Sequence, residues 1–179
     1  MALAGLLVCA VMLFGAPRSA RAAGCPGAGL RPTAANAHAV DAATLCLVDE
    51  IRAGYRVRAL RANAELGRVA FSQVASMVRF DYFADIRPTG QTPMSLTLGT
   101  RYPAHAAGIS VGQNIAWGTG SYATPAHIVA EWMASRPHRE IMLDGEFRDA
   151  AVAVTPALPS VLHVGRHGAV YAVEFGRRR

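Results

Sequence analysis

The chain has 179 residues, 52% of them hydrophobic, which is enough apolar material for one sizeable core but hardly for two. Its formal charge of +6 comes entirely from arginine, because the sequence contains no lysine. The arginines form no basic run interleaved with aromatic residues, so composition argues against a nucleic-acid-binding protein and leaves at most a loose, salt-sensitive attraction to anionic polymers or membrane surfaces.

Residues 1–22 have the pattern of a secretory signal peptide. The segment from Leu3 to Phe14 is apolar and uncharged but too short to span a membrane, and Ala20-Arg21-Ala22 follows it as a small-x-small cleavage site. We therefore predict export and cleavage after Ala22. Because a basic segment before the apolar run is missing, a misplaced start codon and a buried N-terminal helix remain as alternatives.

Residues 23–37 are predicted to form a Gly/Pro/Ala-rich leader that contains Cys25. Cleavage after Ala22 removes Cys9 and leaves two thiols, Cys25 and Cys46, in an oxidising compartment. We predict that they form a disulfide, which for a loop of about 20 residues stabilises by roughly 3 kcal/mol. The alternatives are two unpaired cysteines, or acylation of Cys25 at a weak lipoprotein-like sequence.

Two amphipathic helices are predicted next. Apolar residues at helical spacing indicate a first helix from about Ala39 to Tyr55 and a second from about Ala64 to Phe80. Leu60-Arg61-Ala62 reads as the link between them, and Asn63 is the expected N-cap of the second helix. A loop rich in turn residues, Asp81 to Pro93, follows.

The second half of the chain predicts three short strands and a helical segment between the first two. The strands are Val111 to Trp117, Ala150 to Thr155 and Ala169 to Phe175, and the helix runs from Pro125 to Ser135. The elements do not follow strict β-α-β alternation and their connections are short. We therefore expect an α+β domain with a small, mainly antiparallel sheet covered by helices.

Several short motifs occur in a specific order. They are Asn63-x-x-Leu66, Tyr82-Phe83-Ala84-Asp85, Gly90-Gln91-Thr92-Pro93, Gly112-Gln113-Asn114-Ile115-Ala116-Trp117-Gly118, Trp132-Met133-x-Ser135-x-x-His138-Arg139 and Tyr171-x-Val173-x-Phe175-Gly176. Together they resemble the CAP superfamily, also called SCP-like extracellular proteins, in its compact bacterial form. The resemblance implies an α-β-α sandwich over residues 38–176, followed by a basic tail, residues 177–179.

The resemblance also implies a pocket, and here the sequence departs from the family pattern. Family members typically place a His at the end of the aromatic loop, a Glu in a Gly-Glu-Asn-Ile strand and a second His after the Trp helix, around a cavity that can hold a divalent metal. This chain keeps only His138. Asp85 stands in place of the first His and Gln113 in place of the Glu. The resemblance implies that these three side chains surround one cavity.

The substitutions change the chemistry expected there. Gln113 is nearly isosteric with Glu but uncharged, so it cannot act as a base. Asp85 brings in a carboxylate that can orient or charge-pair His138. A metal needs three or four converging ligands, whereas only His138 and Asp85 are plausible, with Glu131 a distant third. We therefore predict no cofactor, with zinc on His138 and Asp85 as the alternative.

The other candidate residues have structural interpretations. Because Pro137 follows closely, Ser135 is expected to cap a short helix, Arg136 to Leu143, rather than to act as a nucleophile. Phe83 and Trp117, together with Tyr82, are candidates for the floor of an apolar groove. The remaining histidines show no metal-ligand spacing and are interpreted as surface or loop residues: His38, His105, His127, His163 and His167.

Two functional hypotheses follow from this sequence. The first is a secreted, monomeric, non-catalytic binding module for an extracellular lipid, peptide or cell-wall fragment. It has no nucleic-acid partner, and loose association with the cell envelope is an option. Its predicted pocket residues are Asp85, Gln113, Glu131, Ser135 and His138. The alternative is a weak extracellular hydrolase or protease that uses His138 with Asp85. One scaffold hosts several activities, so the resemblance alone does not decide between them.

Overall fold

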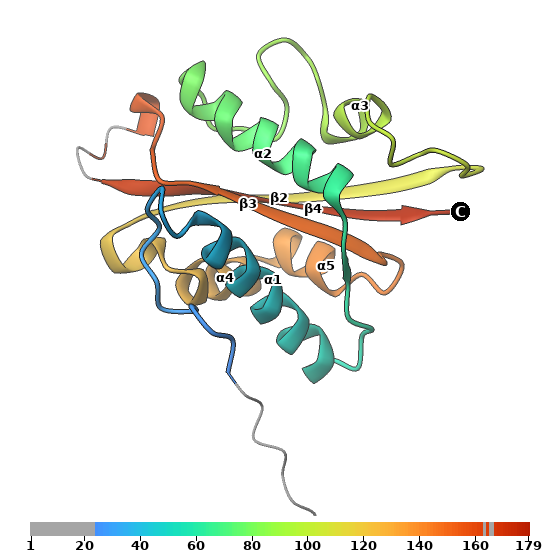
Figure 1. The fold of residues 1–179 in the computed structure, drawn as a ribbon, viewed down its shortest axis with the longest axis horizontal. Coiled ribbons are helices and arrows are strands. Elements are labelled where there is room, and N and C mark those ends of the chain that lie inside the picture. The colour runs from blue at the N-terminus through green and yellow to red at the C-terminus, as the bar shows by residue number, and fades with distance from the viewer. Residues whose placement is uncertain (1–23, 163, 165–166) are drawn as a thin grey trace, which may run out of the picture.

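The computed structural model describes residues 24–162, 164 and 167–179, so the predicted signal peptide, residues 1–22, and His163 lie outside the described residues. A four-stranded sheet in the order β1-β3-β4-β2 has α2 and α3 on one face and α1, α4 and α5 on the other (Figure 1). The predicted α-β-α sandwich is therefore confirmed. No helix among the described residues is both long and apolar enough to cross a bilayer.

The two long helices form where the apolar spacing predicts them. Helix α1 spans Ala37–Gly54 and α2 spans Ala64–Arg79, within two residues of the expected bounds. Asn63 is the N-cap of α2, as predicted, and its Oδ1 accepts the backbone N–H groups of Glu65 and Leu66 at 3.0 and 3.2 Å. This cap fixes where α2 begins above the sheet.

The sheet is mainly antiparallel. Strands β2 (Ile109–Thr119) and β3 (Asp149–Thr155) both pair antiparallel with the central β4 (Gly168–Arg178), and β2 forms one edge. Alternate residues of β4 point into the two layers, so that Tyr171 packs on the α1 side and Ala172 on the α2 side. Residues of β2 and β4 at paired positions therefore share a face, which matters for the site below.

Four short elements depart from the sequence prediction. The predicted link contains a two-residue strand, β1 (Arg61–Ala62), which pairs in parallel with β3. Pro93 does not close the loop but begins a helix, α3 (Pro93–Leu98), with a Thr92–Ser95 capping box. The 3-10 turns η1 (Gly120–Ala123) and η2 (Ser160–Leu162) were also not predicted. Elements of two to six residues are too short to show a periodic pattern.

The α4–α5 segment flanks the edge strand β2. Helix α4 spans Pro125–Ala134 and α5 spans Arg136–Leu143, with the extended residue Ser135 between them. Trp132 Nε1 donates to the backbone oxygen of Ile115 on β2 at 3.1 Å, and Asn114 Nδ2, also on β2, donates to the backbone oxygen of His138 at 3.0 Å. These two bonds hold the corner between α4 and α5 against the sheet.

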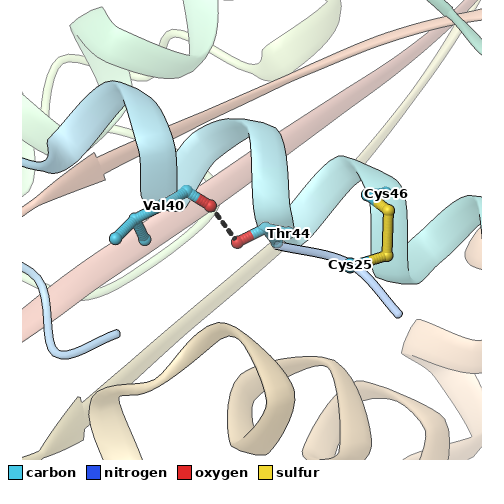
Figure 2. Close-up of a disulfide and its surroundings, with 4 residues drawn as sticks. All are labelled: Cys25, Val40, Thr44 and Cys46. Atoms are coloured by element: carbon cyan, nitrogen blue, oxygen red, sulfur yellow. Dashed lines mark hydrogen bonds between the residues drawn. A yellow bond between two sulfur atoms is a disulfide. The ribbon is translucent and has the colours of Figure 1, made fainter. Parts of the chain in front are cut away.

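The leader is attached to the domain by the predicted disulfide. Cys25 and Cys46 are joined, with an S–S distance of 1.99 Å, so the disulfide prediction is confirmed (Figure 2). The backbone N–H of Ala126 at the start of α4 also donates to the oxygen of Ala28 at 2.9 Å. The leader therefore connects α1 with α4 on the same face of the sheet.

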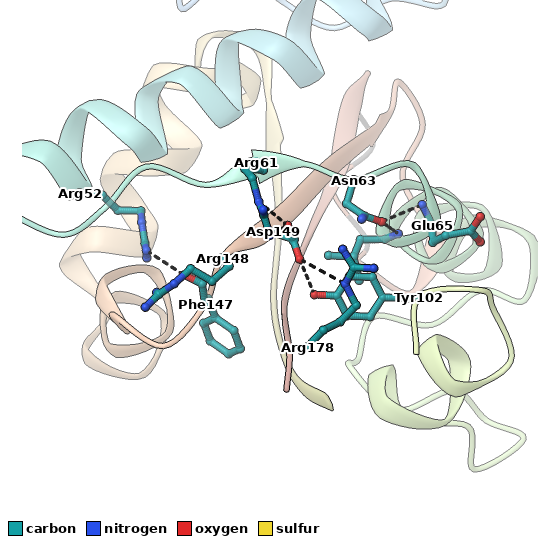
Figure 3. Close-up of polar contacts among 10 residues, drawn as sticks. Arg52, Arg61, Asn63, Glu65, Tyr102, Phe147, Arg148, Asp149 and Arg178 are labelled. Atoms are coloured by element: carbon teal, nitrogen blue, oxygen red, sulfur yellow. Dashed lines mark hydrogen bonds and ion pairs between the residues drawn. The ribbon is translucent and has the colours of Figure 1, made fainter. Parts of the chain in front are cut away.

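The C-terminal arginines are part of the sheet and not a separate tail. Arg177 and Arg178 continue β4, and Arg179 exchanges backbone hydrogen bonds with the segment at Ala107 and Gly108. Next to this end, the buried carboxylate of Asp149 accepts from Arg61 at 3.0 Å and from the Tyr102 hydroxyl at 2.9 Å (Figure 3). The predicted boundary at residue 176 therefore falls inside the strand.

Candidate functional site

A cleft follows the outer edge of β2. On one side lies the loop that contains Tyr82-Phe83-Ala84-Asp85, called the aromatic loop, and on the other side lies the corner between α4 and α5. Its volume is about 250 Å³. Three of the five predicted pocket residues, Glu131, Ser135 and His138, line it, as do Phe83 and Trp117. Asp85 and Gln113 are not among its lining residues, and their side chains belong to a polar cluster described below.

The loop that carries Phe83 and Asp85 is held by α2. Gln73, buried on α2, donates from Nε2 to the backbone oxygen of Ala84 at 2.8 Å. Arg87 donates from Nε to Gln73 Oε1 at 3.1 Å and from Nη2 to Ser72 Oγ at 2.6 Å. These contacts determine where Asp85 lies. Gln73 and Arg87 carry no sequence signature of this role, because the partner of a polar side chain depends on how the loop folds against the helix.

Asp85 and His138 interact electrostatically across the site. Burial raises the pKa of Asp85, and the nearby charge of His138 opposes this effect and lowers it. The two residues come from the aromatic loop and from α5, 53 positions apart in the sequence. His138 Nδ1 is buried and has no hydrogen-bond partner in the described structure.

Gln113 pairs with a residue that the sequence analysis missed, Glu174. The two are directly opposite each other in the β2–β4 register, and Gln113 Nε2 donates a short hydrogen bond to Glu174 Oε1. Glu174 is fully buried. Burial raises its pKa to about 8, and the Asp85 carboxyl adds to the rise, while the Gln113 hydrogen bond and the Arg87 charge oppose it. At neutral pH Glu174 is therefore mostly protonated.

The family pattern expects a carboxyl group at position 113 on β2. In this chain Glu174, at the paired position of the neighbouring strand β4, supplies one. Glu174 was visible in the sequence as the polar member of an alternating set with Val170 and Ala172, a set whose other members are apolar core residues. An acid on a core face needs a partner. Finding that partner requires the strand register, which places Gln113 opposite Glu174.

Four side chains therefore form one polar cluster behind the cleft: Asp85, Gln113, His138 and Glu174. Within the described residues, three of its buried atoms lack hydrogen-bond partners, namely Gln113 Oε1, Glu174 Oε2 and His138 Nδ1. Unsatisfied buried atoms cost free energy, and in native proteins they concentrate where structure serves function.

The cluster holds donor atoms of the kinds that bind metals, but they do not converge on one point in this arrangement. Two carboxyl groups and one imidazole are donor types that divalent metals accept. In the described part of the chain, however, the donor atoms of Asp85, His138 and Glu174 do not all lie within 4.8 Å of one another. Cys25, Cys46 and Glu50 do meet that spacing, but their two sulfur atoms are joined in the disulfide.

Ser135 lies at the N-cap position of α5, as predicted, but its side chain makes no capping hydrogen bond. Its backbone oxygen accepts the N–H of Arg139 at 2.9 Å. Among the described residues no hydrogen bond joins the Ser135 hydroxyl to His138, although both line the cleft. Ser135 therefore lines the cleft, and in the described part of the chain its hydroxyl is not hydrogen-bonded to His138 as a nucleophile would be to its base.

Comparison with solved structures finds the same fold in bacterial proteins. An extracellular protein containing a SCP domain from Bacillus anthracis str. Ames superposes with a TM-score of 0.63 at 20% identity, covering 79% of this chain and 41% of that one. An outer surface protein from Borrelia burgdorferi gives 0.61 at 16% identity, covering 75% and 90%. A cysteine-rich secretory protein from Staphylococcus aureus subsp. aureus Mu50 gives 0.55 at 14%, covering 83% and 42%.

This chain therefore spans about two fifths of the length of the first and third of these proteins. No curated protein sequence matches it. The model of the CAP family, described as the cysteine-rich secretory protein family, matches residues 45–157, which is more than half of the chain and includes Asp85, Gln113 and His138. The chain belongs to the cysteine-rich secretory protein (CAP) family.

Proposed function

We propose that this protein is an exported binding module that holds an extracellular ligand, a lipid, a peptide or a cell-wall fragment, in the cleft along β2 and does not react with it. The observation that carries this proposal is the state of the carboxyl group behind the cleft. Glu174 is fully buried, is hydrogen-bonded to Gln113, and has a pKa raised to about 8. A protonated, inaccessible acid cannot serve as a general base at neutral pH.

The walls of the cleft favour binding. Phe83 and Trp117 offer apolar surface, and Glu131, Ser135 and His138 offer hydrogen-bonding groups at the opposite wall. Ligand sites commonly combine mostly apolar surface with a few polar groups of this kind. The neighbouring Asp85 carboxyl then orients His138 for ligand contact.

Export is supported by two observations. The chain contains a Cys25–Cys46 disulfide, and disulfides persist in oxidising compartments but are rare in cytosolic proteins. The similar solved structures include proteins described as extracellular, outer surface and secretory.

The test is to incubate the purified protein separately with a peptide library, a lipid extract and a digest of cell walls, and to analyse both the retained molecules and the cleavage products. We expect retention of a ligand without cleavage. The variant Ser135→Phe places a ring in the cleft and should abolish retention, whereas Ala53→Phe adds the same ring at an exposed position of α1 and should not.

The hydrolase alternative makes the opposite prediction. If His138 with Asp85 activates a nucleophile, the wild-type protein will cleave peptides and the His138→Ala variant will not. Cleavage that depends on His138 would therefore refute the proposed binding function.

A further inference from the structure

The cleft beside β2 continues beyond Trp117 into a second cavity. This cavity has a volume of about 370 Å³ and is lined by Trp117, Thr119, Tyr122, His127 and Glu131. Trp117 and Glu131 also line the first cleft, so the two cavities adjoin. The first cleft alone, at about 250 Å³, is smaller than most ligand sites, which occupy roughly 300–1,000 Å³. Joined, the two form an elongated site within that range.

Two aromatic rings of this site are open to solvent. Trp117 on β2 is 38% exposed and Tyr122 on η1 is 61% exposed. The turn that carries Tyr122 packs tightly on β2, because a Cβ atom at Gly118 would overlap the backbone carbonyl of Tyr122. The Tyr122 ring also packs edge-on against His127, with ring centroids 4.6 Å apart. Tyr122 is therefore held in place beside the cavity while much of its ring remains available to a ligand.

A polar pair lies next to these rings. His127 Nε2 is 3.6 Å from Glu131 Oε1, one helical turn away on α4, and both side chains are partly exposed. His127, predicted from the sequence to be a surface or loop residue, lies partly exposed on α4 in the wall of the cavity. The cavity thus combines aromatic surface with hydrogen-bond donors and acceptors at its side.

This combination has a specific chemical match. A pyranose ring presents flat faces of C–H groups, which pack on aromatic rings, and a rim of hydroxyl groups, which hydrogen-bond to imidazole and carboxylate groups. An acyl chain offers no hydrogen-bonding group to the His127–Glu131 pair, whereas a sugar hydroxyl can both donate and accept. An acidic sugar would bring its charge close to the Glu131 carboxylate, so a neutral glycan fits better.

We propose that the joined site binds a neutral oligosaccharide, with sugar rings packed on Trp117 and Tyr122 and hydroxyl groups bonded to His127 and Glu131. This inference rests on the proposed binding function and names the class of ligand. The polar cluster behind the first cleft then lies at one end of the bound chain and Tyr122 at the other.

Intrinsic fluorescence provides a direct test, because the chain has two tryptophans and only one of them lines the cavities as an exposed ring. Trp117 is 38% exposed and lines both cavities, whereas Trp132 lines only the first cleft and is 1% exposed. We use tetra-N-acetylchitotetraose, a neutral β-linked oligosaccharide called chitotetraose below, as the probe. We expect a saturable change in emission on titration, which is lost in Trp117→Phe because that variant lacks the reporting indole.

Affinity should then depend on the second cavity. Tyr122→Ala removes one packing surface and should weaken binding about tenfold, which corresponds to 1.4 kcal/mol. Glu131→Gln should weaken it less, because the amide still accepts a hydrogen bond. Tyr55→Ala is the matched control: Tyr55 is 59% exposed at the end of α1 and does not line either cavity, so affinity should not change.

Absence of a saturable change with chitotetraose, or an unchanged affinity in both Tyr122→Ala and Glu131→Gln, would overturn the glycan inference. Parallel titrations with palmitate and with a peptide pool separate this failure from that of the proposed function. A saturable Trp117 response to either of those probes, without one to chitotetraose, refutes the glycan and leaves the binding function standing. Peptide cleavage that depends on His138 refutes the binding function itself.

Discussion

Glu174 places a carboxyl group in the middle of a sheet, where most neighbours are apolar. Desolvation is the largest cause of its raised pKa, and the hydrogen bond from Gln113 offsets only part of it. Asp85 is buried in the same cluster, and its pKa is also raised. Two buried acids with raised pKa values, next to His138, are costly for stability. Such arrangements are typical of functional sites.

This cost predicts a specific dependence of stability on pH. The pKa of Glu174 is about 8 in the folded state against 4.5 in the unfolded chain, so between these values the folded state holds a proton that the unfolded state has lost. Stability therefore falls as the pH rises through this window. Glu174→Gln removes the titrating group and should stabilise by a few kcal/mol above pH 8 but little below pH 4.5. Thermal unfolding across this range checks it.

An equal effect of Glu174→Gln at both ends of the pH range would contradict a raised pKa and indicate a purely steric effect. Gln113→Glu is the informative companion variant. It places a second carboxyl group opposite Glu174 and should destabilise the protein most at high pH, where both groups would need to ionise.

The interaction between Asp85 and His138 predicts a second titration result. Because the charge of His138 lowers the pKa of Asp85, His138→Ala should raise the pKa of Asp85 further. Carbon-13 NMR of the Asp85 carboxyl group measures this directly. His38→Ala, which removes a histidine beside Asp41, is the control and should leave Asp85 unaffected. An unmoved Asp85 titration in His138→Ala would show that the two groups do not interact.

At the level of elements, a buried arginine connects the end of α1 to the segment between α5 and β3. Arg52 is fully buried, and its guanidinium donates to the backbone oxygens of Arg58, Met142 and Asp144 at 2.9, 2.6 and 3.1 Å. A fourth, longer bond reaches Phe147 at 3.4 Å (Figure 3). The planar guanidinium suits this role because it carries several donors in a fixed geometry.

Replacing this arginine should therefore be severe. Arg52→Met keeps much of the apolar stem but leaves several buried carbonyl oxygens unpaired, so we expect the free energy of unfolding to fall by about 3 kcal/mol or more. Urea unfolding measures the change. Arg52→Lys should rescue only part of the loss, because an ammonium group cannot reach all of the oxygens. A change of a few tenths of a kcal/mol in Arg52→Met would contradict this role.

The disulfide has a similar connecting role for the leader. With a sequence separation of 21 residues, its loss should lower stability by about 3 kcal/mol. We expect reductant to lower the melting temperature of the wild-type protein. The double variant Cys25→Ser/Cys46→Ser should melt at the reduced temperature with or without reductant. An identical melting temperature for the wild type in oxidised and reduced form would contradict a stabilising role.

These elements also show what the sequence could predict. The helical spacing of apolar residues predicted α1 and α2. The strong preference of asparagine for the N-cap position predicted the role of Asn63. Counting the cysteines that the predicted cleavage would leave predicted the disulfide. The partners of Arg52, Gln73 and Glu174 could not be predicted, because each is set by the register or the loop path of the folded chain. The carboxyl group opposite Gln113 was missed for that reason.

On the scale of the whole molecule, the sandwich brings three distant segments to one edge of the sheet. The aromatic loop lies against α2 on one face of the sheet. Helices α4 and α5 lie on the other face, and the edge strand β2 runs between the two layers (Figure 1). An unprotected edge strand risks pairing with other chains. Here the Trp132 and Asn114 bonds secure the α4–α5 corner beside β2, and the remaining space along the edge forms the cleft.

Native mass spectrometry of the intact protein, purified from the cells that produce it, tests most directly whether this cleft holds a ligand. We predict that the wild-type protein and the Ala53→Phe control carry a small molecule that is released on denaturation, and that Ser135→Phe, with its cleft filled, carries none. The opposite result, in which Ser135→Phe and the wild type carry the same molecule in the same amount or all three carry nothing, would contradict a ligand site along β2.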